Sequence, residues 1–175
     1  MGHQPFETVL ETHHAEIYRY LLRVTGRVGD ADDLSQETFL RAWKAYRGLP
    51  GDANVRAWLF TIATNLSRNH FRTERRRRTA HEAVRVTRAE IDGASPDGHA
   101  QYNEARARLE RVVAALPFKQ RLAFVMRKIH DVDYETIARS LDCSAESARA
   151  HVFQALRKIR RDLENLALPH MELQR

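Results

Sequence analysis

The chain has 175 residues, of which 43% are hydrophobic and 30% charged, with a formal net charge of +6 and a pI near 9.9. This composition is typical of a globular protein, and no apolar run approaches the roughly 18 residues of a membrane span, which excludes a membrane-embedded protein. The positive charge favours a polyanionic partner such as nucleic acid or an anionic membrane surface.

The charge is concentrated in one part of the chain. Residues 1–50 carry 7 acidic and 6 basic side chains, whereas residues 51–90 carry 4 acidic and 9 basic ones. This distribution predicts a localised nucleic-acid contact. A single cysteine, Cys143, and an N-terminus without the basic cluster or apolar stretch of a secretory signal predict a cytoplasmic protein.

The spacing of apolar residues predicts three helices in the first half. The first begins near Phe6, and Gly26 and Gly29 are expected to end it. Asp30 or Asp32 is expected to cap the second helix, whose inward positions are Leu34, Thr38, Phe39, Ala42, Trp43 and Tyr46.

A third helix is predicted after the break at Gly48, Pro50 and Gly51. Asp52 or Asn54 is expected to cap it, and it is expected to continue to about Arg76. Its inner stripe comprises Val55, Trp58, Leu59, Ile62, Leu66 and His70. Its outer face presents Arg56, Asn65, Arg68, Asn69, Arg72 and Arg75.

The periodic pattern is lost before the second half, and the stretch 93–98 favours neither helix nor strand. We therefore predict an all-α fold of two small helical domains, 1–78 and 101–168, joined by a flexible linker at 79–100 and followed by a tail at 169–175. In the second domain Pro117 is expected to begin a helix whose inner face includes Leu122 and Met126.

The segment from Asp133 to Arg161 has the pattern of a helix-turn-helix. Asp133 is expected to cap a short helix, and Ser144 a longer one whose inward residues include Leu156. Outward residues near the start of the longer helix could reach base edges in a major groove, namely Ser147, Arg149, His151 and Gln154. Arg157, Lys158 and Arg161 suit phosphates. The alternative is a solvated helix hairpin.

The third helix carries a second nucleic-acid signal, a basic and amide-rich face that ends in four arginines at 75–78. Aromatic residues interleave with this face, as in proteins that bind single strands by charge and stacking. A solvated charged face, with Trp58 in the core, is the alternative.

The acidic cluster at Asp32, Asp33, Gln36 and Glu37 lacks the nucleophile, histidine set or glycine-rich loop of an enzyme site. We predict a docking face for a basic partner, with no catalytic residues, no metal and no cofactor. For Cys143, structural burial is favoured over redox sensing.

Four segments, taken together, resemble the extracytoplasmic-function sigma factors of the sigma-70 class. Asp30–Trp43 is similar to the polymerase-binding helix of that family and Arg56–Asn65 to its promoter-melting helix. Ala115–Pro117 followed by Arg121, and Tyr134–Leu141, are similar to the start of its second DNA-binding domain.

The resemblance implies a sigma factor that binds core RNA polymerase, through its beta-prime clamp helices and beta flap, and promoter DNA, with an anti-sigma factor as regulator. It implies no small-molecule substrate and no membrane insertion. The implied polymerase-binding residues are Asp32, Asp33, Gln36, Glu37 and Arg41. The implied −10 DNA residues are Gly51, Asp52, Asn54, Asn65, Arg68, Asn69, Arg72 and Arg75. The implied −35 DNA residues are Ser144, Ser147, Arg149, His151, Gln154, Arg157 and Lys158.

The chain departs from the family pattern at three positions: Asp142 replaces a common glycine in the turn, Ala148 a common valine, and His151 a residue that is usually basic. The −35 sequence preference therefore does not carry over. Two other classes stay open from the residues alone: a helix-turn-helix repressor or activator, and an RNA-binding helical protein that uses the arginine run.

Overall fold

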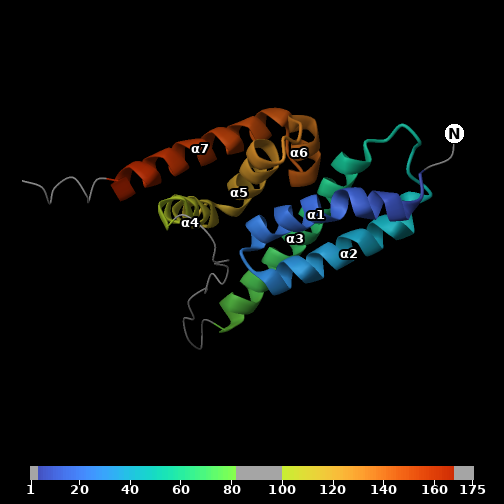
Figure 1. Ribbon diagram of the computed structural model, residues 1–175, viewed down its shortest axis with the longest axis horizontal. Coiled ribbons are helices and arrows are strands. Elements are labelled where there is room, and N and C mark those ends of the chain that lie inside the picture. Colours follow the sequence, from blue (N-terminus) through green and yellow to red (C-terminus); the bar gives the residue numbers. More distant parts are fainter. Residues whose placement is uncertain (1–3, 82–99, 168–175) are drawn as a thin grey trace, which may run out of the picture.

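The computed structural model describes residues 4–81 and 100–167, and within these ranges it contains helices and no strand (Figure 1). This agrees with the predicted all-α fold. The helices are α1 Phe6–Thr25, α2 Val28–Tyr46, α3 Val55–His81, α4 Ala100–Ala114, α5 Phe118–Phe124, the π-helical turn η1 Val125–Ile129, α6 Tyr134–Leu141 and α7 Ala145–Ala167.

The α3 helix is longer than predicted. It continues through His81, so residues 79–81 of the predicted linker are helical. The rest of that linker, 82–99, and the predicted tail, 169–175, lie outside the described residues. In Figure 1 the last turns of α3 extend away from the other helices.

The first domain is a three-helix unit formed by α1, α2 and α3. Its buried side chains recur three and four apart on each helix, as the hydrophobic pattern predicted. A buried hydrogen bond joins the Tyr20 hydroxyl to Thr64 Oγ1 at 2.8 Å, which satisfies two polar groups inside the core. The apolar core residues of this unit include Ile17, Leu21, Val24, Ala31, Leu34, Phe39, Leu59, Phe60 and Ala63.

The connection between α1 and α2 differs from the prediction. Gly26 ends α1 in the left-handed region, with φ of 71°, as expected of a C-terminal glycine. Gly29, however, lies inside α2, which starts at Val28. The predicted caps Asp30 and Asp32 also lie inside α2. The prediction that Gly29 ends α1 and the prediction that Asp30 or Asp32 caps α2 were therefore wrong. Asp30 instead pairs with His70 on α3, with Oδ2 and Nε2 3.4 Å apart.

The second domain packs α4, α5 and α6 against α7. Two predicted caps are confirmed there. The Asp133 carboxylate accepts hydrogen bonds from the Thr136 amide at 2.7 Å and hydroxyl at 2.8 Å, and Ser144 Oγ accepts from the Ser147 amide at 3.0 Å. Asp142 ends α6 with φ of 54°, the left-handed conformation that aspartate tolerates where the family commonly has glycine.

The cap at Asp133 gives a stability prediction. Replacing Asp133 with alanine should lower the free energy of unfolding by about 0.5–2 kcal/mol, because two hydrogen bonds at the start of α6 are lost. Urea-induced unfolding followed by circular dichroism measures this. Asp133→Asn keeps a capping oxygen and is the control. Equal losses in the two variants would contradict a capping role.

The two domains form one body with a continuous hydrophobic core. The α6 helix lies against α3 (Figure 1), and the contacts also place η1 against α1. The Phe71 and Phe118 rings meet across the boundary with centroids 4.2 Å apart. The Thr64 hydroxyl contacts Met126 Sδ at 3.6 Å. The linker therefore joins domains that are packed together in this structure.

Candidate nucleic-acid interface

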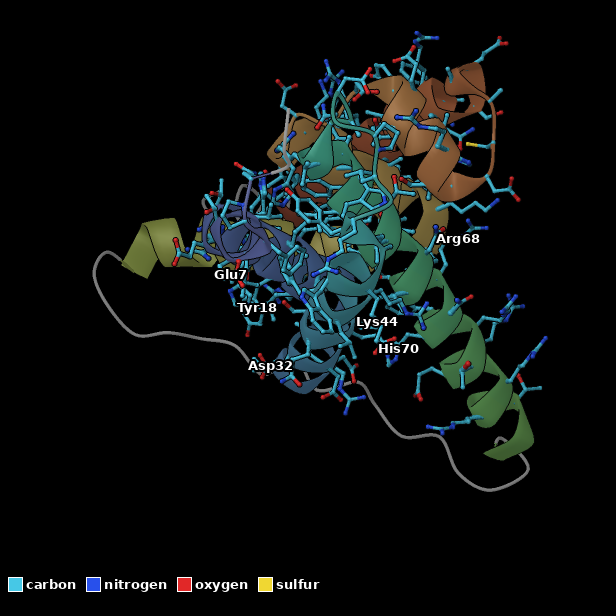
Figure 2. The ribbon with its side chains drawn as sticks, turned by 90° about the vertical axis from the view of Figure 1, so that its right-hand side faces the viewer. Glu7, Tyr18, Asp32, Lys44, Arg68 and His70 are labelled. Carbon is cyan, nitrogen blue, oxygen red and sulfur yellow. The ribbon has the colours of Figure 1, made fainter. Side chains whose placement is uncertain are left out.

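The predicted basic face of α3 is largely exposed. Asn65, Asn69, Arg72 and Arg75 are all accessible on this helix, and Arg72 donates a hydrogen bond to Asn69 Oδ1 at 3.1 Å. Figure 2 shows the second half of α3 projecting from the body with its side chains in the open. A surface hollow near its end is lined by Arg72, Arg75, Arg76 and Thr79. Such a group of guanidinium groups and a hydroxyl suits phosphate oxygens.

Arg68 differs from its neighbours on this face. It is half-buried, and its guanidinium donates to the main-chain carbonyl of Ser140 at 3.1 Å. Figure 2 shows it where α3 meets the second domain. One predicted DNA-binding side chain is therefore engaged by the protein itself.

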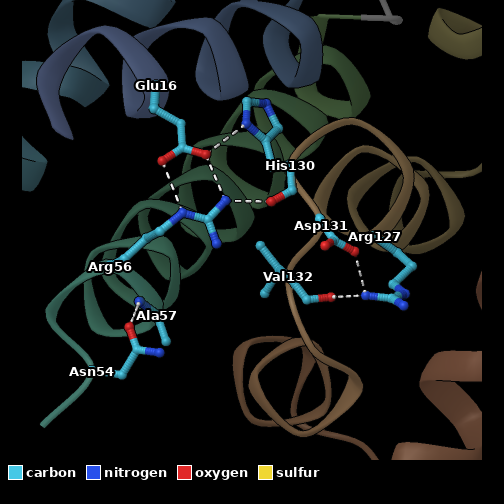
Figure 3. Close-up of polar contacts among 8 residues, drawn as sticks. All are labelled: Glu16, Asn54, Arg56, Ala57, Arg127, His130, Asp131 and Val132. Atoms are coloured by element: carbon cyan, nitrogen blue, oxygen red, sulfur yellow. Dashed lines mark hydrogen bonds and ion pairs between the residues drawn. The ribbon is translucent and has the colours of Figure 1, made fainter.

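The loop before α3 carries the remaining predicted −10 residues. Gly51, Asp52 and Asn54 are all exposed. Of the two predicted caps, the structure uses Asn54, whose Oδ1 accepts from the Ala57 amide at 2.9 Å (Figure 3). This loop and Arg72 lie at opposite ends of a helical segment of about 27 Å, so a ligand that touched both would have to run along α3.

The predicted docking face of α2 is exposed and partly apolar. Asp32, Asp33, Gln36 and Arg41 are exposed and Glu37 is half-exposed, with an ion pair of 2.5 Å between Glu37 and Arg41. Trp43 was predicted on the inner stripe of this helix, which was wrong, because it is 60% exposed. Leu40 is 45% exposed. Helical spacing places Asp33, Gln36, Leu40 and Trp43 on one face. Large exposed apolar side chains inside a polar rim are typical of protein-binding surfaces.

The helix-turn-helix residues are brought together at the start of α7. Arg149, Gln154 and Arg157 are exposed, and Ser144 is exposed as the cap. The Arg149 guanidinium lies 5.1 Å from the Tyr134 ring centroid, and Gln154 Oε1 accepts from Gln120 Nε2 at 2.8 Å. The other predicted members of this set, Ser147, His151 and Lys158, are half-buried.

Two features of α7 were not predicted. Phe153 is 65% exposed, one residue before Gln154 and four after Arg149. An apolar side chain on a helix that lies in the major groove can contact thymine methyl groups. The helical period alone places Phe153 on the same side of the helix as Arg149, so the sequence could have predicted this position. Leu156, predicted to face inward, is 40% exposed.

His151 is half-buried on the same helix. Burial, followed by the charge of Lys119, lowers the pKa of His151.

A polar cluster joins the domains near the start of α3 (Figure 3). The Arg56 guanidinium donates to both carboxylate oxygens of Glu16, at 2.6 and 3.0 Å, and to the carbonyl of His130. Hydrogen bonding to Arg56 lowers the pKa of Glu16. Arg56, predicted on the outer face of α3, is engaged by Glu16 and by the carbonyl of His130.

His130 is buried at this contact, 7% exposed, between the rings of Tyr20 and Phe60. Its Nδ1 lies 3.4 Å from Glu16 Oε1, and its buried Nε2 has no hydrogen-bond partner among the described residues. Burial lowers the pKa of His130, and Glu16 opposes that shift only in part. Burial therefore favours the neutral form of the imidazole over the charged form.

Residues 4–81 and 100–167 contain neither a candidate metal centre nor a candidate membrane span. Over these ranges, His, Cys, Asp and Glu side chains do not gather into a group that could hold a metal ion. In the same part of the chain, every helix is too short or too polar to cross a bilayer. Cys143, predicted to be buried, is half-buried.

Comparison with known proteins gives matches on both domains. Residues 9–77 match the family model for Sigma-70 region 2, and residues 106–159 match that for Sigma-70, region 4. The ECF RNA polymerase sigma-E factor of Escherichia coli is 30% identical over 134 residues, which cover 73% of this chain and 70% of that protein. The RNA polymerase sigma-H factor of Pseudomonas aeruginosa is 27% identical over 92% of this chain and 87% of its own length.

Solved structures show the same fold. The sigma factor RpoE in complex with the anti-sigma factor NepR from Bartonella quintana matches with a TM-score of 0.75 and 21% identity, over 91% of this chain and 96% of that one. CnrH in complex with the cytosolic domain of CnrY matches with a TM-score of 0.66 and 21% identity, over 91% and 88%.

The two matched regions, in this order, define a transcription initiation factor of the sigma-70 class. Within that class the chain belongs to the extracytoplasmic-function (ECF) sigma factors. The resemblance stated from the sequence is thereby confirmed.

Proposed function

We propose that the exposed faces of this sigma factor divide its work as follows. The docking face of α2, comprising Asp32, Asp33, Gln36, Glu37, Leu40, Arg41 and Trp43, binds core RNA polymerase. The α3 face and its preceding loop bind the melted −10 element. The start of α7 reads the −35 element, with Phe153 added to the predicted residues. The protein acts in the cytoplasm and supplies no covalent chemistry, since melting is differential binding to single strands.

The observation that carries this proposal is the composition of the α2 docking face. Trp43 and Leu40 are exposed next to four predicted acidic or amide residues and Arg41. A large aromatic side chain that stays in water, surrounded by charges, is explained by a partner that buries it. The α3 and α7 faces carry arginine and amide groups, which suit nucleic acid better than a protein surface.

Regulation by an anti-sigma factor is part of the proposal. The two solved structures above, RpoE with NepR and CnrH with the cytosolic domain of CnrY, are both complexes of that kind. Their folds match this chain over nine-tenths of its length. An inhibitor that covers the α2 docking face would compete directly with polymerase.

The test is run-off transcription with core RNA polymerase on a library of promoter fragments. Asp33→Arg with Glu37→Arg is expected to lower the transcript yield about a hundredfold, because like charges then oppose a basic partner. The matched control is Glu7→Arg with Glu11→Arg, which reverses two exposed charges at the same spacing on α1. Equal losses in both variants, or none, would overturn the role of α2.

A wild-type protein that binds duplex DNA but never directs core polymerase to initiate would instead support a repressor-like role. Circular dichroism spectra confirm that both variants are folded.

A further inference from the structure

A hydrogen bond ties the predicted DNA-reading face of α7 to α5. Gln154, an exposed member of the predicted −35 set, accepts through Oε1 from Gln120 Nε2 at 2.8 Å. Gln120 is half-buried on α5. The α5 helix packs against α7, and its residues Leu122 and Ala123 are fully buried. The exposed Gln154 side chain is therefore tethered to a neighbouring helix that is well packed.

The burial of the Gln120 amide explains which end of Gln154 is engaged. Gln120 Oε1 is buried and has no hydrogen-bond partner among the described residues. If the Gln120 amide were reversed, its amino group would take that buried place, and two donors would be left unpartnered instead of one acceptor. Gln120 therefore donates, and Gln154 accepts.

This hydrogen bond changes what Gln154 can offer to a base. A glutamine side chain binds adenine with both ends of its amide, because the oxygen accepts from N6 and the amino group donates to N7. Gln120 draws the Gln154 oxygen toward α5, which leaves the Nε2 amino group, a donor, for the base. The major-groove edge of guanine presents two acceptors, N7 and O6, and suits such a donor.

We propose that Gln120 is a positioning residue for −35 recognition, because it makes Gln154 a donor that prefers guanine to adenine. The inference rests on the proposed role of α7 in reading the −35 element. Gln120 acts through Gln154 and not by touching a base. The preference at the base pair that Gln154 reads is therefore set in part from α5, outside the helix that enters the groove.

A neighbouring residue of the same face is held by different contacts. The Arg149 guanidinium lies 5.1 Å from the centroid of the Tyr134 ring, and the Arg127 guanidinium lies 5.1 Å from the same centroid. Cations over an aromatic face are attracted by its electrons. Because Gln120 takes no part in these contacts, its loss should leave the base pair read by Arg149 unchanged. That base pair is an internal control on the same DNA.

The test is run-off transcription at limiting holoenzyme on one promoter in which each −35 base pair is replaced in turn by the other three. Gln154→Ala identifies the base pair that Gln154 reads, as the pair at which discrimination is lost. At that pair we expect Gln120→Leu, which removes the donor at a similar side-chain volume, to lower the guanine-to-adenine ratio of transcript yield about fivefold. The ratios at the other base pairs should change by less than about twofold.

Two further variants separate positioning from a general role in folding. Gln120→Glu offers only an acceptor, so the Gln154 amide should turn its amino group toward α5 and expose its oxygen. The guanine-to-adenine ratio should then fall below that of Gln120→Leu, because guanine presents no donor in the major groove. In a Gln154→Ala background, Gln120→Leu should change no base preference, since the side chain through which it acts is missing. Circular dichroism spectra confirm that the variants are folded.

The outcomes distinguish positioning by Gln120 from the role of α7. If −35 substitutions alter the wild-type yield but Gln154→Ala or Gln120→Leu leaves every preference unchanged, positioning is wrong and the role of α7 stands. A wild-type preference for adenine at the identified pair would overturn positioning too, as would an effect of Gln120→Leu that persists without Gln154. If no −35 substitution alters the wild-type yield, the role of α7 is wrong and positioning is rejected with it.

Discussion

Replacing Phe60 with alanine is expected to lower the free energy of unfolding by about 3–5 kcal/mol. Phe60 is fully buried. Its ring meets Tyr20 edge to face at 5.1 Å and His130 at 5.3 Å, and the Arg56 guanidinium lies 5.1 Å from its centroid. Truncation would leave a cavity bordered by three elements, and aromatic pairs add stability beyond the buried area.

Since single domains are stable by about 5–15 kcal/mol, such a loss should be visible as a marked shift of the urea midpoint. Phe153→Ala is the control, because Phe153 is 65% exposed and its truncation should change stability by no more than about 0.5 kcal/mol. Similar losses in the two variants would mean that the contacts of Phe60 do not support the core as described.

Acidification below pH 6.5 is expected to destabilise the folded protein through His130. Burial lowers the pKa of His130 below its ordinary value of 6.5, so the unfolded chain takes up a proton that the folded chain does not. The stabilising contribution is complete above pH 6.5 and is lost as the pH falls through the lowered folded-state pKa. The charged groups that face the imidazole are Glu16 and Arg23 of α1 and Arg56 of α3.

The measurement is the free energy of unfolding as a function of pH in wild type and in His130→Gln. One proton gives a slope of at most about 1.4 kcal/mol per pH unit, and the variant should lack that part of the slope. His13 and His151 also have lowered pKa values and contribute with the same sign, but they are present in both proteins. The lowered pKa of Glu16 acts in a separate window, below pH 4.5. Identical slopes in the two proteins would exclude His130.

Local signals predicted several helix ends well. Asn54, Asp133 and Ser144 cap their helices as expected, since a cap needs only an oxygen within three residues of a free amide. The same reasoning failed at Asp30, because Gly26, Gly29 and Asp32 lie close to it in the sequence and each could also mark a helix end. There the pairing with His70 on α3 holds Asp30, and no local rule contains that contact.

The hydrophobic period also has a limit that particular residues make clear. It assigned Trp43 and Leu156 to buried stripes, and both are exposed, at 60% and 40%. A period shows which residues share a face of a helix, but the width of the neighbour that covers this face decides where burial ends. The exposed edge of α2 became a candidate docking face only once its neighbours were in place.

The sequence by itself determined the helical class, the two units, the helix-turn-helix and the family, because these follow from short-range periodicity, capping and motifs. Tertiary structure alone decided which arginines contact the other domain. Arg68 and Arg72 are equivalent in the sequence pattern, yet Arg68 is held by the Ser140 carbonyl and Arg72 is exposed. The physical reason is that the acceptor for Arg68 is a main-chain carbonyl at the end of a helix 72 residues away. Every residue has such a carbonyl, so only packing can bring a particular one to a particular arginine.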